Sequence, residues 1–251
     1  MIFDGTEKII GHGAQAEVYL WKGYAYKVFR PDYPAEWIAF EIDQQKAVNA
    51  LGLCPVRYEK TEDAHTIKMD FVDGIMLEER LNGGYKDGFA DLAAAHRFVH
   101  SVEAAGTIPN LRESFTSAIN SFSLPGITDA QKRRALEIIN AIPEEKRVCH
   151  LDLHLQNLMF LKDSKDAFPY VIIDWMNARE GNPIFDYARV FVIFKEFAPY
   201  IVDFFMGAIK DDLNKLQSKD AFHDAVGVCA LLRLTEHNSD AVRQIVKEYL
   251  G

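Results

Sequence analysis

Residues 149–157 read CHLDLHLQN and residues 171–175 read VIIDW, and these two stretches decide how the chain folds. Asp152 stands five positions before Asn157, and Asp174 follows an apolar run in the second stretch. A short apolar run of this kind predicts a buried β-strand, here one that delivers a carboxylate. Taken alone, the first stretch also suits a polar turn between a helix and a strand, so its meaning depends on the rest of the chain.

The polar residues of these stretches have the chemistry that phosphoryl transfer requires. Such a site needs a carboxylate that orients the attacking hydroxyl and oxygen ligands that hold Mg²⁺ on the phosphates. Asp152 suits the first role, and its spacing from Asn157 is that of a kinase catalytic loop, H-x-D-x-x-x-x-N. Asn157 and Asp174 suit the second role, because Mg²⁺ takes few protein oxygens and leaves its other positions to water and phosphate.

The N-terminal part of the chain has the two-residue period of β-strands. Strands are predicted at 9–11, 17–21 and 24–29, the last two joined by a Lys22-Gly23 turn. Residues 11–18 read GHGAQAEV, one residue away from a kinase glycine-rich loop. Gly11 and Gly13 would let backbone N–H groups approach phosphate oxygens. An ordinary hairpin with two glycines is the alternative.

Lys27 lies in the third predicted strand, in the context of the lysine that holds the α and β phosphates in kinases. A solvated strand lysine is the alternative. A helix is predicted to begin at Pro34 and to end before Gly52. Glu41, in the middle of this helix, is predicted to pair with Lys27; Glu36 is the competitor, and a surface charge is the alternative for both. The predicted apolar face of the helix consists of Trp37, Phe40, Ala47 and Val48.

Two more strands are predicted at 56–60 and 66–71, and a linking segment follows. In a kinase the backbone of such a segment binds adenine, and by that analogy the carbonyl of Asp70 and the N–H of Val72 do so here. Beyond Met76 the apolar period changes to about 3.6. Helices are predicted at 89–102, from Thr128 to before Pro143, at 186–194, 200–216 and 221–235, and from Ser239 to Leu250.

Composition excludes several classes of function. A net charge of -9 argues against a surface for nucleic acid or for an anionic membrane. The three cysteines are odd in number and show no C-x-x-C spacing, so neither a disulfide framework nor a zinc site is indicated. Residues 1–7 lack the pattern of a secretory signal, and charges and a proline interrupt the apolar stretch 190–209. We therefore expect a cytoplasmic protein without a membrane-spanning helix, whose oligomeric state the sequence leaves open.

Together, HLDLHLQN at 150–157, VIIDW at 171–175 and GNPIFDYAR at 181–189 resemble the aminoglycoside phosphotransferase and choline kinase-like family. Its pattern is H-G-D-x-H-x-x-N, then I-D-W or I-D-F, then D-x-A. The resemblance implies an α+β, two-lobed protein-kinase-like fold with ATP in the cleft between the lobes. Residues 1–73 would form an N-terminal, antiparallel-sheet, nucleotide-binding lobe, and residues 74–251 a larger, mainly helical catalytic and substrate lobe.

The resemblance also implies a role for each motif residue. Asp152 would be the base, Asn157 and Asp174 would hold Mg²⁺, and Lys27 with Glu41 would position the phosphates of ATP. Asp186 resembles the family's structural aspartate, which braces the catalytic loop. The implied activity is transfer of the γ-phosphate to a hydroxyl of a small molecule that is aminoglycoside-, choline- or sugar-like.

Leu151 and Asn177 depart from the family pattern, which has glycine at the first position and often an acid at the second. Neither change removes a group that phosphoryl transfer requires. His150 and His154 are interpreted as residues that hold the loop, with metal ligation as the alternative, and Arg189 as an ion-pair partner rather than a phosphate clamp.

Two other functions are weighed against the small-molecule kinase. Only twelve positions separate Asp174 from Asp186, without an A-P-E segment, so a protein substrate is disfavoured. A catalytically silent, nucleotide-binding module is the second alternative, and the retained base and metal ligands argue against it.

Overall fold

The computed structural model describes residues 3–162, 164, 169–216 and 219–251. Contacts divide the chain into two compact units. The first unit comprises Met1–Arg80 and Gln156–Met176, and the second comprises Leu81–Leu155 and Asn177–Gly251. The functional division into lobes at 1–73 and 74–251 stays a prediction.

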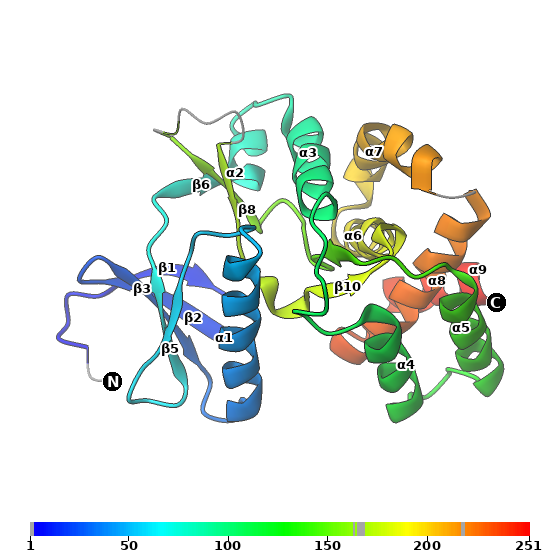
Figure 1. The fold of residues 1–251 in the computed structure, drawn as a ribbon, viewed down its shortest axis with the longest axis horizontal. Coiled ribbons are helices and arrows are strands. Elements are labelled where there is room, and N and C mark those ends of the chain that lie inside the picture. The colour runs from blue at the N-terminus through cyan, green and yellow to red at the C-terminus, as the bar shows by residue number, and fades with distance from the viewer. Residues whose placement is uncertain (1–2, 163, 165–168, 217–218) are drawn as a thin grey trace. The chain divides into compact units, whose positions relative to one another are not determined.

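The first unit contains a five-stranded antiparallel sheet in the order β1-β2-β3-β5-β4 (Figure 1). Its strands are β1 (Lys8–His12), β2 (Ala16–Trp21), β3 (Tyr24–Phe29), β4 (Tyr58–Lys60) and β5 (Thr66–Asp70). Lys22 and Gly23 both have positive φ, 49° and 81°, and together they form the predicted two-residue turn between β2 and β3. Such turns match the twist of the paired strands. Lys27 lies on the central strand, opposite Val18 on one side and Ile67 on the other.

Helix α1 (Ala35–Ala50) follows Pro34, as predicted. Its buried residues are Ile38, Glu41, Ile42, Gln44, Gln45 and Val48. The prediction that Trp37 lies on the buried face is wrong, because its side chain is 47% exposed. The helix instead buries polar groups that find partners: Gln45 donates to the carbonyl of Val56 at 2.7 Å.

A second, three-stranded sheet of the first unit has the order β6-β8-β9. Its strands are β6 (Gly74–Met76), β8 (Leu158–Leu161) and β9 (Tyr170–Ile172), and the short helix α2 (Leu77–Asn82) follows β6. Strand β9 confirms the buried strand that was predicted before Asp174.

The second unit is mainly helical. Its helices are α3 (Gly88–His100), α4 (Leu111–Ser121), α5 (Asp129–Ala141), α6 (Pro183–Phe197), α7 (Val202–Leu216), α8 (Lys219–Glu236) and α9 (Asp240–Leu250). Strands β7 (Arg147–Cys149) and β10 (Arg179–Gly181) pair with each other, and a short 3-10 turn occupies Pro199–Ile201. Another 3-10 turn, Trp175–Asn177, begins in the first unit and ends in the second. The capping box predicted at Thr128 is confirmed. Among the described residues, no helix is both long and apolar enough to cross a membrane.

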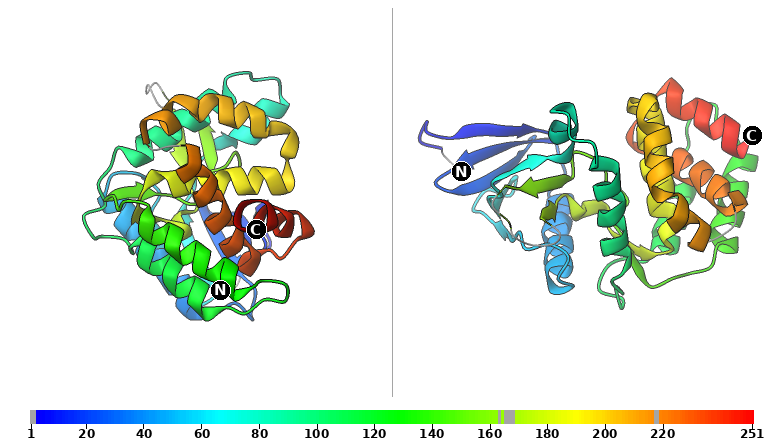
Figure 2. Two further views of the ribbon diagram at one scale, coloured as in Figure 1. Left: turned by 90° about the vertical axis from the view of Figure 1, so that its right-hand side faces the viewer. Right: turned by 90° about the horizontal axis from the view of Figure 1, so that it is seen from above.

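Helix α6 forms the centre of the second unit. All of its residues from Pro183 to Phe194 are buried, and it packs against α7, α8, α9 and β7 (Figure 2). It begins three residues before the predicted start, because Asn182 caps it through the N–H of Ile184 and Pro183 fits its first turn. The buried position of α6 is what allows its polar residues to hold the loop described next.

Candidate active site

The loop that contains Asp152 is held by helix α6. The carboxylate of Asp186 accepts hydrogen bonds from the N–H groups of His150, at 2.9 Å, and Leu151, at 2.7 Å. Burial opposes ionisation of Asp186, but the hydrogen bond from His100 and the neighbouring imidazoles keep its pKa well below the ordinary value. The predicted bracing role of Asp186 is therefore confirmed.

Leu151 has a left-handed backbone conformation, with φ of 61°. This conformation costs an L-residue about 1–2 kcal/mol, whereas glycine, the residue of the family pattern, adopts it freely. Helix α6 holds the peptide groups on both sides, because Asp186 accepts the N–H of Leu151 and Arg189 Nε donates to its carbonyl at 3.2 Å. The leucine side chain is 4% exposed, so the strained turn is fixed by buried contacts.

The two histidines of the loop lie beside Asp152. His150 is fully buried, and its Nδ1 accepts the N–H of Asp152 at 3.2 Å. His154 Nε2 lies 3.8 Å from Asp152 Oδ1, and the backbone N–H of His154 donates to the Asp152 carbonyl. Both contacts agree with the predicted loop-holding role. The Asp152 side chain is 21% exposed, and its role as the base stays a prediction.

Strands β8 and β9 bring Asn157 and Asp174 together in the first unit. Leu158 lies opposite Ile172, and the N–H of Ile173 donates to the carbonyl of Asn157 at 3.0 Å. Asn157 is 8% exposed, whereas the Asp174 side chain is 43% exposed and its φ is 63°. One amide oxygen and one partly exposed carboxylate are a donor set that fits Mg²⁺, so the residues present suit the predicted ligand role.

Lys27 joins the sheet, helix α1 and the metal-ligand candidates. Its Nζ lies 2.6 Å from Glu41 Oε1 and 3.8 Å from Asp174 Oδ1. Burial opposes the charge of Lys27, but Asp174 and Glu41 raise its pKa above the ordinary value. Glu41 is 2% exposed, and its burial raises its pKa. The neighbouring charge of Lys27 lowers the pKa of Glu41, but the effect of burial is larger. The structure thus contains the predicted pair, and Glu36 is exposed.

The other nucleotide-site candidates lie on the same unit. Gly11 and His12 are the last two residues of β1. The N–H of Gly13 donates a hydrogen bond to the Ala16 carbonyl at 2.8 Å, which closes the turn before β2. Asp70 ends β5, and its carboxylate pairs with Arg57 at 3.0 Å. Val72 lies in the segment between β5 and β6. The roles of these four candidates toward a nucleotide stay predictions.

Other polar contacts around α6 were only partly foreseen. Arg189 forms an ion pair with Glu236, so its predicted role as an ion-pair partner is confirmed. The sequence reasoning missed His100, whose Nε2 lies 2.8 Å from Asp186 Oδ2. It also missed His96, which lies one helical turn before His100. The four-residue spacing of two histidines on one predicted helix was the signal that could have found them.

Comparison with known proteins gives one family. A model described as the phosphotransferase enzyme family matches residues 6–217. A search of curated proteins gives no match.

Solved structures give likenesses along nearly the whole chain. A choline/ethanolamine kinase family protein from Mesorhizobium loti has 15% identity and a TM-score of 0.59, over 98% of this chain and 86% of that chain. The GDP complex of aminoglycoside 2'-phosphotransferase-IIIa has 15% identity and a TM-score of 0.57, over 96% and 90%. Choline kinase LicA from Streptococcus pneumoniae has 12% identity and a TM-score of 0.57, over 96% and 91%. The predicted α+β, two-lobed protein-kinase-like fold is confirmed.

Proposed function

Because the chain belongs to the phosphotransferase enzyme family, we propose that it is an ATP- and Mg²⁺-dependent kinase of a hydroxylated small molecule. Its family and similar structures support a small-molecule phosphotransferase. The observation that carries the proposal is the contact of Lys27 with both Glu41 and Asp174, in the unit that also holds Asn157. A lysine held between two carboxylates has the position that phosphoryl-transfer sites give to the lysine on the phosphates.

ATP is the proposed phosphate donor, and residues 1–73 are the proposed nucleotide-binding lobe. Lys27 would bind the α and β phosphates, with Glu41 fixing its reach. Gly11 and Gly13 would allow the hairpin backbone to lie close to the phosphates. The adenine would bind the backbone of the segment after β5, at the carbonyl of Asp70 and the N–H of Val72. Solved relatives in complex with GDP and AMP support nucleotide binding.

Asn157 and Asp174 are the residues that would hold Mg²⁺. The ion, when bound, neutralises charge on the phosphates of the nucleotide. The short contact between the Asn157 backbone and Ile173 keeps the two ligand candidates at neighbouring positions. The partial exposure of Asp174 leaves room for water and phosphate oxygens in the remaining ligand positions.

Asp152 is the proposed base, in the proposed catalytic lobe of residues 74–251. The acceptor oxygen would attack the γ-phosphorus, the bond between that phosphorus and the leaving ADP oxygen would break, and the acceptor proton would pass to the Asp152 carboxylate. Asp186 accepts the N–H groups of His150 and Leu151 and so fixes the backbone from which Asp152 projects. A reducing cytoplasm suits this activity and the three free, buried cysteines.

ADP release in the presence of Mg-ATP tests the proposal across hydroxylated amines, amino sugars, macrolides, choline and sugars. We expect one acceptor class to stimulate release, and Asp152→Asn to lower kcat by at least about 100-fold. Asp211→Asn, at an exposed position of α7, is the matched control and keeps the wild-type rate. If Mg-ATP raises the melting temperature but no acceptor is phosphorylated, the silent nucleotide-binding module replaces the kinase. Equal rates in wild type and Asp152→Asn contradict the assignment of the base.

A further inference from the structure

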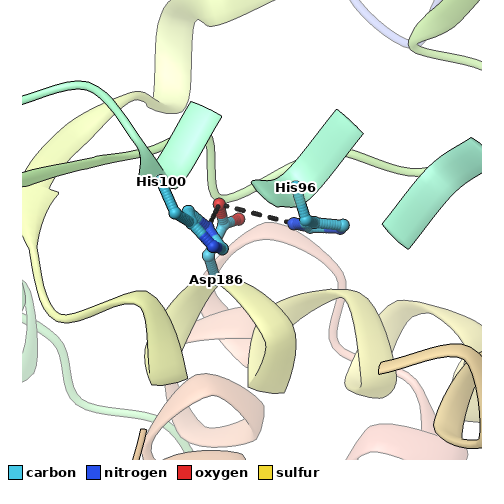
Figure 3. A group of neighbouring side chains, drawn as sticks. All are labelled: His96, His100 and Asp186. Carbon is cyan, nitrogen blue, oxygen red and sulfur yellow. Dashed lines mark hydrogen bonds and ion pairs between the residues drawn. The ribbon is translucent and has the colours of Figure 1, made fainter. Parts of the chain in front are cut away.

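Two histidines of α3 and one aspartate of α6 meet inside the second unit (Figure 3). His100 Nε2 lies 2.8 Å from Asp186 Oδ2, and His96 Nδ1 lies 3.7 Å from the same oxygen. One donor atom from each side chain falls within 4.8 Å of the other two. We propose that these three side chains bind a divalent transition-metal ion of the zinc type.

His96 provides the first argument for a bound ion. It is fully buried, and neither ring nitrogen has a hydrogen-bond partner among the described residues. The 3.7 Å separation from Asp186 is too long for a hydrogen bond, and the ring otherwise faces the aromatic rings of Tyr187 and Phe205. A buried polar group without a partner costs about 1–3 kcal/mol. An ion that accepts the Nδ1 lone pair would give a partner to one of the two ring nitrogens.

The donor set provides the second argument. Two imidazoles and one carboxylate are ligands that zinc takes, whereas Mg²⁺ prefers oxygen alone. His100 presents Nε2 to the carboxylate of Asp186 at 2.8 Å. Its Nε2 becomes a ligand when the ring proton moves to Nδ1. Asp186 is already oriented by the N–H groups of His150 and Leu151, as metal-bound carboxylates commonly are.

The spacing of the donor atoms needs only a small adjustment. Zinc bonds of about 2.0–2.2 Å in tetrahedral geometry place ligand atoms about 3.4 Å apart. The 3.7 Å distance from His96 to Asp186 is close to this value. The 2.8 Å distance from His100 to Asp186 would have to increase by roughly half an ångström, which a small rotation of the His100 side chain allows.

The site also has a route to solvent. A groove of about 470 Å³ in the second unit is lined by residues that include His100, Tyr187 and Asp212. His100 therefore connects the buried cluster to a hydrated surface, through which an ion could enter and water could fill the fourth ligand position. A bound ion would tie α3 to α6 at the residue that braces the loop of Asp152.

Metal titration of the chelator-treated protein tests this inference. The probe is Co²⁺, added with excess Mg²⁺ so that oxygen-ligand sites are occupied. We expect one equivalent to bind with the intense visible absorption of a four-coordinate site, and Zn²⁺ to displace it. X-ray absorption at the zinc edge of the wild-type protein should show scattering from two imidazoles and none from sulfur.

The variant His96→Phe removes one ligand and keeps an aromatic ring beside Tyr187 and Phe205. We expect it to weaken Co²⁺ binding by more than about 100-fold, since loss of a second-shell partner alone costs about 10–100-fold. His223→Phe, a ring substitution at an exposed position of α8, is the matched control and keeps wild-type affinity. Absence of the absorption in wild type, sulfur ligation, or equal affinity in a folded His96→Phe would each overturn the proposal. If His96→Phe does not fold, the wild-type spectra decide the question.

Discussion

Leu151 offers a sharp test of the backbone geometry at the candidate active site. Its φ of 61° is held by two hydrogen bonds to α6, and its side chain is 4% exposed. Truncation to alanine keeps the strained conformation and removes buried methyl groups, so Leu151→Ala should lose about 2–5 kcal/mol of unfolding free energy. Leu151→Gly loses the same contacts but also releases about 1–2 kcal/mol of strain.

The order of the two variants is the informative result. At ordinary positions glycine is less stable than alanine by about 0.5–1 kcal/mol. At Leu151 the released strain outweighs this cost, so we expect Leu151→Gly to be more stable than Leu151→Ala by about 0.5–1 kcal/mol. The same pair of substitutions at Leu153 is the control, since this residue of the same loop is fully buried and lacks a positive φ. There alanine should be the more stable variant.

Urea unfolding followed by circular dichroism measures all four variants. The difference between the glycine and alanine variants should have opposite signs at the two positions. If glycine is the less stable residue at both, Leu151 does not carry the backbone strain and the reasoning is refuted. Unfolding midpoints are compared only between variants whose unfolding free energy falls with urea at the same slope.

Three further predictions concern charge and capping. Lys27→Met leaves Glu41 buried without its partner and should lose about 3–5 kcal/mol of stability; adding Glu41→Gln should restore much of it, and urea unfolding compares the two variants. Burial opposes ionisation of Glu196, but hydrogen bonds from hydroxyl, imidazole and guanidinium neighbours, Arg233 among them, lower its pKa. Its contribution is therefore fully present above an unfolded-state pKa of about 4.3 and is lost as pH falls through the lower folded pKa. The stability difference between wild type and Glu196→Gln should thus shrink in urea melts below about pH 4; a constant difference contradicts this. Thr128→Ala should lose about 1 kcal/mol by removing the capping box of α5, whereas Thr128→Ser should not, as measured by thermal unfolding.

Local patterns were sufficient to predict much of the first unit. The Lys22-Gly23 turn and the alternating strands led to the correct placement of Lys27, and the position of Glu41 within one helix led to the ion pair. The turn and the strands are determined by neighbours in the sequence, whereas the ion pair joins two elements and was predicted from the analogy with kinases. The confirmed capping box at Thr128 belongs to the same class, because its hydrogen bonds span three residues.

Features that depend on distant residues could not be predicted in this way. The face of α1 that is buried depends on Lys27 and Val56, so an apolar residue such as Trp37 is exposed while Glu41 is enclosed. Strands β6 and β8 were not foreseen, since short elements have weak periodicity. Helix α4 was also missed, although it is as long as the predicted helix α9. The positive φ of Leu151 follows from contacts with Asp186 and Arg189, which lie more than thirty positions away.

The enclosed position of α6 has a consequence for how this protein could be altered. Helix α6 supplies both the acceptor for the Leu151 N–H and the donor to the Leu151 carbonyl. The position of Asp152 therefore depends on the position of this buried helix. Surface helices could be redesigned without disturbing this placement. A core substitution that slid α6 along its axis would instead misplace the Asp152 carboxylate without changing any residue of its loop.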